Sequence, residues 1–219
     1  GIIYSEGKYI KRDMNKAIHY YTLAANQNFP NAQYNLGSIY SEGKFIERDM
    51  NKAIYYLTLA ANQNFPNAQN NLGFIYSEGK YIERDINKGI HYLTLAANKN
   101  YPGAQFNLGF IYSEGKYIER DMNKAIHYLT LAANQNDPYA QNTLGFIYSE
   151  GKYVERDMNK SIHYFTLAAN QNDPYAQNTL GFIYSEGKYV ERDMNKSIHY
   201  FTLAANQNDP YAQNTLGFI

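Results

Sequence analysis

The sequence predicts an all-α protein, a right-handed α-solenoid built from helix-turn-helix repeats of 36 residues. The segment 145–180 is repeated letter for letter as 181–216. A fixed repeat period of this length is typical of solenoids, in which each repeat buries its apolar face against its neighbours. The pentapeptide Tyr-Ser-Glu-Gly-Lys keeps the same step along the whole chain, beginning at Tyr4, Tyr40, Tyr76, Tyr112, Tyr148 and Tyr184.

The ends of the sequence fall at the same point of the repeat. The segment Gly1-Ile2-Ile3 aligns with Gly217-Phe218-Ile219, and this point lies within the first helix that each repeat is expected to form. We therefore expect residues 1–219 to form a single array of about six repeats that is truncated inside a helix at both ends. The period has no interruption that would indicate a linker.

The first helix of each repeat has a clear start and end, best seen in the copy that begins at Asp137. Asp137 is expected to cap the helix and Pro138 to occupy its first turn, where a missing N–H costs nothing. Gly151 is expected to end it in the left-handed conformation. At 100° per residue, one face gathers the residues expected in the core. They are Ala140, Leu144, Ile147, Tyr148 and Gly151.

A second helix is predicted from about Met158 to Gln171, with Asp157 as its N-cap and Asn172 as its left-handed end. Its expected buried stripe contains Ser161, Tyr164, Phe165, Ala168 and Ala169. His163, Thr166 and Asn170 fall on the opposite, polar side. Two antiparallel helices joined by a short loop, repeated without a break, give the predicted solenoid.

The second repeat carries a set of residues that matches a known pattern: Ala32, Tyr34, Leu36, Gly37, Tyr40, Gly43, Asp49, Lys52, Ala53, Tyr56, Ala60 and Ala61. In these residues the unit resembles the Sel-one-like repeat (SLR), a relative of the tetratricopeptide repeat. The resemblance extends over the whole chain. It implies that the first helices line a concave surface and that the array is a scaffold for other proteins.

Two related repeats fit less well. A tetratricopeptide unit is two residues shorter and has a shorter step than the ten residues from Gly43 to Ala53. The pentatricopeptide repeat, which reads RNA, fits neither this loop nor the neutral charge. The chain departs from the SLR pattern where Phe45 or Tyr81 replaces the second loop glycine, so we expect a different loop shape. The Glu155-Arg156-Asp157 loop and its equivalents are candidates for ion-pair ladders between repeats.

Composition limits the partners and the chemistry. Lysine plus arginine equals aspartate plus glutamate, 20 against 20, so no net charge attracts nucleic acid or an anionic membrane. No apolar run approaches the roughly 20 residues that span a bilayer. The chain has no cysteine, which excludes disulfides, thiolate metal sites and thiol nucleophiles. We expect a protein or peptide partner, no nucleic acid, no membrane insertion and no cofactor; the oligomeric state and the compartment stay open.

The sequence favours no catalytic or metal site. Every repeat except the one with Tyr55 at the histidine position holds a serine, a histidine and an aspartate, such as Ser149, His163 and Asp157, but the aspartate is expected to cap a helix and the others to lie on polar faces. The five histidines share one helix position, which Tyr55 occupies in the remaining repeat. Side chains in a straight row on stacked helices about 8–10 Å apart converge poorly on a metal. The histidines are His19, His91, His127, His163 and His199.

The candidate binding residues lie on the side of the first helix that leaves the core stripe. Aromatic rings there would supply contact area, and asparagine amides could bind an extended backbone. The residues are Phe74, Phe110, Phe146 and Phe182, together with Tyr34, Asn70, Phe106, Asn142 and Asn178. We call these nine residues the first-helix row. The alternative is that its rings pack against the first helix of the adjacent repeat.

The predicted function is a non-catalytic protein–protein interaction scaffold that binds a partner along its concave face, as the resemblance implies. The alternative is that the array is the targeting arm of a larger multidomain enzyme such as a protein kinase, because SLR arrays occur fused to other domains. A hydrolase resembling certain cysteine-rich bacterial members of the family is disfavoured by the absence of cysteine.

Overall fold

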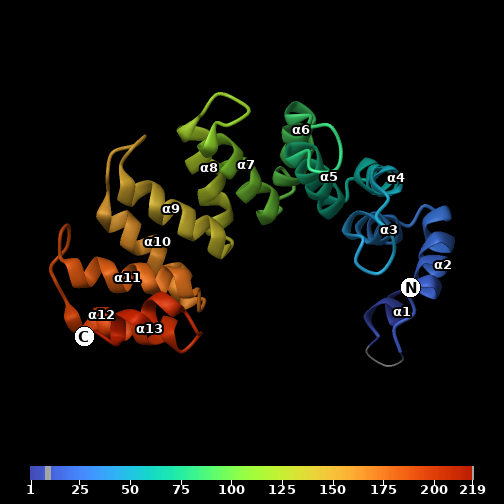
Figure 1. The fold of residues 1–219 in the computed structure, drawn as a ribbon. Helices are drawn as coiled ribbons and strands as arrows, with labels where there is room; N and C mark the ends of the chain where they lie inside the picture. The colour runs from blue at the N-terminus through green and yellow to red at the C-terminus, as the bar shows by residue number, and fades with distance from the viewer. Residues whose placement is uncertain (8–10, 219) are drawn as a thin grey trace. The chain divides into compact units, whose positions relative to one another are not determined.

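The structure is a computed structural model that describes residues 1–7 and 11–218, and this part of the chain is helical without strands (Figure 1). Ile219, which the repeat alignment places in a helix, lies outside the described residues. The thirteen helices found in the described part are α1 (Ile2–Glu6), α2 (Met14–Asn26), α3 (Pro30–Glu42), α4 (Met50–Asn62), α5 (Pro66–Glu78), α6 (Ile86–Ala97), α7 (Pro102–Glu114), α8 (Met122–Ala133), α9 (Pro138–Glu150), α10 (Met158–Asn170), α11 (Pro174–Glu186), α12 (Met194–Ala205) and α13 (Pro210–Leu216).

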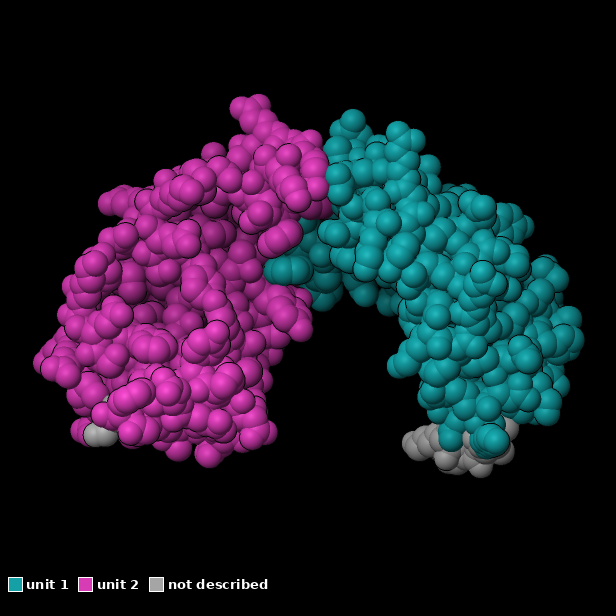
Figure 2. Space-filling model, viewed as in Figure 1, with its two compact units in different colours: residues 1–108 teal, residues 109–219 magenta. Residues whose placement is uncertain are grey.

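The chain divides into two compact units, Gly1–Leu108 and Gly109–Ile219 (Figure 2). In unit 1, α3 packs against α4 and α5 against α6, while α2 contacts α3 and α4 contacts α5. Unit 2 repeats this arrangement, with α9 against α10 and α11 against α12. The first helices α3, α5, α9 and α11 therefore each pack against the second helix of their own repeat and against that of the preceding repeat. This arrangement confirms the predicted all-α repeat architecture.

The first helices begin and end where the sequence predicts. In α9, Asp137 Oδ1 accepts a hydrogen bond of 2.8 Å from the backbone N–H of Ala140, and Pro138 follows as the first helical residue. Gly151 ends the helix with φ 62°, a conformation that glycine adopts without steric cost. In α3 and α5 a phenylalanine stands at the N-cap and no side chain caps the helix.

The second helices also agree with the prediction to within one residue. Asp157 Oδ1 accepts a hydrogen bond of 3.0 Å from the backbone N–H of Lys160 at the start of α10. The helix ends at Asn170, one residue before the expected Gln171. Asn172 has φ 62°, as expected for a left-handed ending.

The core is formed where first and second helices approach most closely. Leu144 of α9 is fully buried, as are Phe165 and Ala168 of α10. A Cβ on Gly145 would lie 2.7 Å from a ring carbon of Phe165, so only glycine permits this approach. Ser161 and Ala169 are buried as predicted, whereas Ile147, Tyr148, Tyr164 and Thr166 are half-buried.

The loop arginines bind rings instead of carboxylates. Arg156 lies 4.6 Å from the ring centroid of Tyr189 in the next repeat, and its Nη1 donates a hydrogen bond of 2.8 Å to the Tyr189 hydroxyl. Arg156 also donates to the backbone carbonyls of Ser149 and Glu150. The expected ion-pair ladders between repeats are therefore wrong for this loop. The ring that replaces the loop glycine lies on the surface and links neighbouring repeats through the arginine.

Candidate partner-binding groove

The phenylalanines of the first-helix row differ in exposure along the chain. Phe74 and Phe110 are 53% and 47% exposed, and Phe182 is 39% exposed. Phe146 is half-buried. Equivalent positions in nearly identical repeats thus provide different amounts of accessible apolar surface, and among these four residues Phe74 is the most exposed.

Phe146 and Phe182 pack on the aromatic core of unit 2. The ring centroid of Phe146 lies 4.9 Å from that of Phe165 in an edge-on arrangement, and 5.5 Å from that of Tyr175 in the next first helix. Phe182 makes the same edge-on contact with Phe201 at 4.9 Å. Phe146 therefore packs against the adjacent first helix, as the alternative predicts, and also against the second helix of its own repeat.

The other residues of the row are partly engaged within the chain. The Asn107 side-chain amide donates a hydrogen bond of 3.0 Å to Asn70 Oδ1, and the Tyr34 ring packs 5.4 Å from that of Phe65. Phe106 is half-buried. The Oδ1 atoms of Asn142 and Asn178 are buried without a hydrogen-bond partner. These two oxygens are therefore not accessible in the way that the predicted contact with an extended backbone requires.

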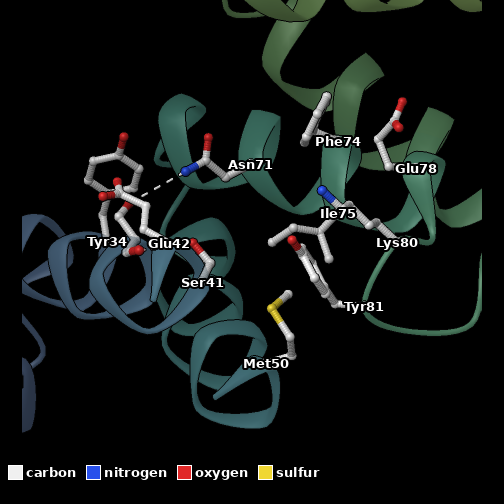
Figure 3. Close-up of a pocket in the computed structure, with 11 residues that line it drawn as sticks. Tyr34, Ser41, Glu42, Met50, Asn71, Phe74, Ile75, Glu78, Lys80 and Tyr81 are labelled. Atoms are coloured by element: carbon white, nitrogen blue, oxygen red, sulfur yellow. Dashed lines mark hydrogen bonds between the residues drawn. The ribbon is translucent and has the colours of Figure 1, made fainter. Parts of the chain in front are cut away.

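Two residues of the row, Tyr34 and Phe74, line a groove between α3 and α5 in unit 1 (Figure 3). Its volume is about 630 Å³, within the range of roughly 300–1,000 Å³ that small-molecule sites occupy. Figure 3 shows Met50 and Tyr81 together at one side and Tyr34 beside Asn71 at the other. The complete lining consists of Tyr34, Ser38, Ser41, Glu42, Met50, Asn71, Phe74, Ile75, Glu78, Lys80 and Tyr81. We call it the Ser38 groove.

Ser38 distinguishes this groove from the equivalent positions in the other repeats. The same position of the repeat holds Ile2 in the first segment and phenylalanine in every later one, from Phe74 to Phe218. In unit 2 the equivalent residue is Phe146, whose ring covers Phe165. The Ser38 hydroxyl is much smaller and accepts a long hydrogen bond of 3.5 Å from the Asn71 side-chain amide.

The rim of the groove carries two carboxylates, one amine and, over Tyr81, the Arg48 guanidinium. Glu42 and Glu78 are exposed, and among the described residues neither forms an ion pair. Lys80 Nζ lies 5.0 Å from the ring centroid of Tyr81, and the Arg48 guanidinium covers that ring at 3.9 Å. The pKa of the Tyr81 phenol is lowered, first by a hydrogen bond with Lys80 and further by the charge of Arg48. The phenol oxygen is thus an acceptor held by cations.

Sequence reasoning missed the residues that make this groove a distinct place, Ser38, Met50, Ile75 and Tyr81. The signal for Ser38 was present, because a polar residue interrupts an otherwise apolar position of the repeat. The contributions of Met50 and Tyr81 could not be read from the period, since these residues reach the groove from loops and neighbouring helices.

The side chains of Ser149, His163 and Asp157 each make a different contact and do not form a triad. Asp157 caps α10, Ser149 Oγ donates to the carbonyl of Phe146, and the exposed His163 ring packs edge-on against Tyr164 at 5.2 Å. Within residues 1–7 and 11–218, no three histidine, aspartate or glutamate side chains gather where they could hold a metal. In the same part of the chain, none of the helices combines the length and the apolar character needed to cross a bilayer.

The sequence model of the Sel1 repeat matches six segments of the chain, residues 1–29, 30–65, 66–101, 102–137, 138–173 and 174–209. No curated protein sequence shows significant similarity to the chain.

Solved structures similar to this chain include a protective antigen of uropathogenic Escherichia coli displaying an SLR fold, with a TM-score of 0.90 and 31% identity. A Sel1 repeat protein from Oxalobacter formigenes matches with a TM-score of 0.86 and 32% identity. The comparisons cover 100% and 99% of this chain but only 47% and 62% of those chains. An immunity protein of Pseudomonas aeruginosa shares the fold, with a TM-score of 0.60 and 19% identity over 93% of this chain and 77% of that one.

Proposed function

Because this chain belongs to the Sel1 repeat family, we propose that it is a non-catalytic scaffold that binds a partner polypeptide along the surface of its first helices. Sel1 repeat proteins generally mediate protein–protein interaction, and the repeat is typically non-catalytic. The chain spans about half the length of the antigen it resembles, so the activity of a longer protein is a further question. The comparisons give no support to the kinase-arm alternative.

The observation that carries this proposal is the Ser38 groove. It combines exposed aromatic surface on Phe74 with the carboxylates of Glu42 and Glu78, neither of which forms an ion pair within the described part of the chain. Aromatic anchors surrounded by polar groups are typical of places where a few residues provide most of the binding energy. The remaining residues of the first-helix row would extend this surface along each unit.

A selection of random peptides displayed on phage, using the purified chain as bait, tests the proposal. We expect Phe74→Ala to weaken the selected peptides by about tenfold, as loss of an interface aromatic does, without a large change in melting temperature. Tyr55→Ala is the matched control, since Tyr55 is an aromatic of unit 1 with 59% exposure on a second helix. Failure to select any peptide, or an equal effect of both substitutions, would contradict the proposal.

A further inference from the structure

We propose that α13 of one copy of this chain binds beside α2 of a second copy, in front of that copy's α1, and so completes a first helix across two chains. The surface involved shares no lining residue with the Ser38 groove, so the inference does not depend on the proposed function. Three observations support it: an apolar hollow beside α2, the match between α13 and the helix segments at the same position of other repeats, and polar side chains whose equivalents pair with each other.

An open hollow of about 750 Å³ lies between α1, α2 and α3, and we call it the α2 hollow. Ala24 of α2 lines it and is half-buried, whereas its equivalents in the other second helices, from Ala60 to Ala204, are fully buried. Tyr20 and Phe29 also line it and are 47% and 53% exposed. Burial of such apolar surface is favourable. The side of α2 that lines the hollow is therefore less covered than the same side of the other second helices.

The other repeats show which segment belongs at this position. There a first helix of thirteen residues, such as α3, packs against the second helix of its own repeat, α4. Beside α2 the same position holds the five residues of α1, which correspond to residues 38–42 of α3. The seven residues of α13 correspond to residues 30–36, the preceding part of α3. In sequence and in length, α13 is thus the segment that completes a first helix in front of α1.

One side of α13 is open to receive α2. Leu216 is half-buried, whereas its equivalents in α3, α5, α7, α9 and α11 are fully buried. Gln213 is exposed, whereas its equivalents, from Gln33 to Gln177, are buried. Ala212 is buried in a cluster with residues of α12. The helix therefore packs on α12 with one side and leaves accessible the side that carries Gln213.

A glutamine pair indicates which side of α13 would meet α2. Within a repeat, Gln63 after the second helix donates its side-chain amide to Gln33 Oε1 of the first helix at 2.7 Å. The residue equivalent to Gln63 beside the α2 hollow is Gln27, and the residue equivalent to Gln33 in α13 is Gln213. We therefore expect Gln27 of one copy to donate to Gln213 Oε1 of the other.

An asparagine pair supports the same register. Between adjacent repeats, the Asn107 side-chain amide donates a hydrogen bond of 3.0 Å to Asn70 Oδ1. The equivalent donor is Asn35, which lines the α2 hollow, and the equivalent acceptor is Asn214 of α13. In this register, residues 217–219 of one copy correspond to residues 1–3 of the other, so the two segments compete for one position.

The first test is the molecular mass of the chain by sedimentation equilibrium at concentrations up to about 1 mM, which detects millimolar dissociation constants. We expect the mass to rise with concentration, because a head-to-tail contact adds copies in a row. Placing Pro-Tyr-Ala-Gln-Asn-Thr-Leu directly before Gly1 should abolish association, since this heptapeptide fills the α2 hollow within its own chain. A scrambled heptapeptide is the control and should leave association intact. Removal of residues 217–219 should strengthen association by ending the competition.

A complementation experiment tests which ends meet. Ala24→Arg blocks the α2 hollow, and Gln213→Arg replaces the expected acceptor on α13, so each variant alone should associate at least about tenfold more weakly. Their equimolar mixture should form a 1:1 dimer and nothing larger, because one variant keeps α13 and the other keeps the hollow. Asn26→Arg, at an exposed position of α2, is the matched control and should associate like the unchanged chain. Circular-dichroism melting curves check that all variants fold. Should Ala24→Arg fold poorly, the heptapeptide variant replaces it in the mixture.

Three outcomes overturn the inference. The first is a mass that stays at that of one chain up to about 1 mM. The second is undiminished association of the folded heptapeptide variant. The third is a mixture that forms no dimer although the unchanged chain associates, because contact would then occur between like ends. Each of these results leaves the scaffold proposal standing, since the phage selection tests a different surface.

Discussion

The smallest scale at which the repeats differ is a single hydrogen bond between two glutamines. The glutamine after the second helix donates its side-chain amide to a buried glutamine of the first helix in the same repeat, at 2.7–2.8 Å in the pairs Gln63–Gln33, Gln171–Gln141 and Gln207–Gln177. In the repeat of α5 and α6 the donor is replaced by Lys99, and Gln69 Oε1 is buried without a partner. An unsatisfied buried acceptor lowers stability.

Lys99→Gln is expected to raise the free energy of unfolding by about 1 kcal/mol, the net contribution of an ordinary hydrogen bond. Urea denaturation measures this change in the free energy of unfolding. The measurement is made in about 0.5 M salt, because salt screens the favourable interaction of Lys99 with the end of α6. The reciprocal change, Gln63→Lys, should lower the free energy of unfolding by roughly 1–3 kcal/mol by leaving Gln33 Oε1 unpartnered. Opposite signs in the two variants support the explanation, and equal signs contradict it.

At the scale of the helix, the burial of a residue at an equivalent position depends on the side chains of the neighbouring helix. Phe146 of α9 packs edge-on against a buried phenylalanine of α10, whereas Phe74 of α5 has a leucine, Leu93, at the equivalent position of α6 and is more than half exposed. The outer ring is therefore better packed in α9 and α11, where it faces a phenylalanine of the second helix, than in α5, where it faces a leucine.

Phe146→Ala is expected to lower the free energy of unfolding by roughly 1–3 kcal/mol, because it removes a half-buried ring and an aromatic pair. Phe74→Ala should cost less than about 1 kcal/mol, because much of its ring already contacts water. Leu144→Ala provides the scale of a full core truncation, roughly 2–5 kcal/mol. Urea unfolding curves of the three variants check the order, which would be wrong if the two phenylalanine variants lost equal stability.

On the scale of the whole molecule, the period made much of the fold predictable. Asp157 and Gly151 mark helix ends that local chemistry alone determines, and Leu144 follows from the spacing of apolar residues. The Ser38 groove depends instead on side chains from three helices and one loop that meet only in space. Burial of Gln69 was likewise missed, because a polar residue on a core face is identified by its partner and not by its period.

The aspartate N-caps are the other feature that recurs from repeat to repeat. A hydrogen bond from the backbone N–H of Lys160 lowers the pKa of the Asp157 carboxyl, with a further contribution from the Lys160 side chain. The pKa values of Asp49, Asp121 and Asp193 are lowered by the same arrangement. Burial has the opposite effect at Asp137, whose pKa is raised.

These pKa shifts predict that acid destabilises the whole chain. A cap whose pKa is lower in the folded chain than the unfolded value of about 3.9 contributes its full stability above that value and loses it as pH falls through the folded pKa. Asp137 contributes with the opposite sign, whereas the pKa is lowered at four of the caps. We therefore expect the free energy of unfolding to be level near neutral pH and to fall below about pH 4, as measured by urea denaturation at a series of pH values. Asp157→Asn keeps a hydrogen-bonding cap while removing its charge, so its pH dependence should be shallower than that of the unchanged chain. An equally steep dependence in this variant would show that groups other than the caps cause the acid sensitivity.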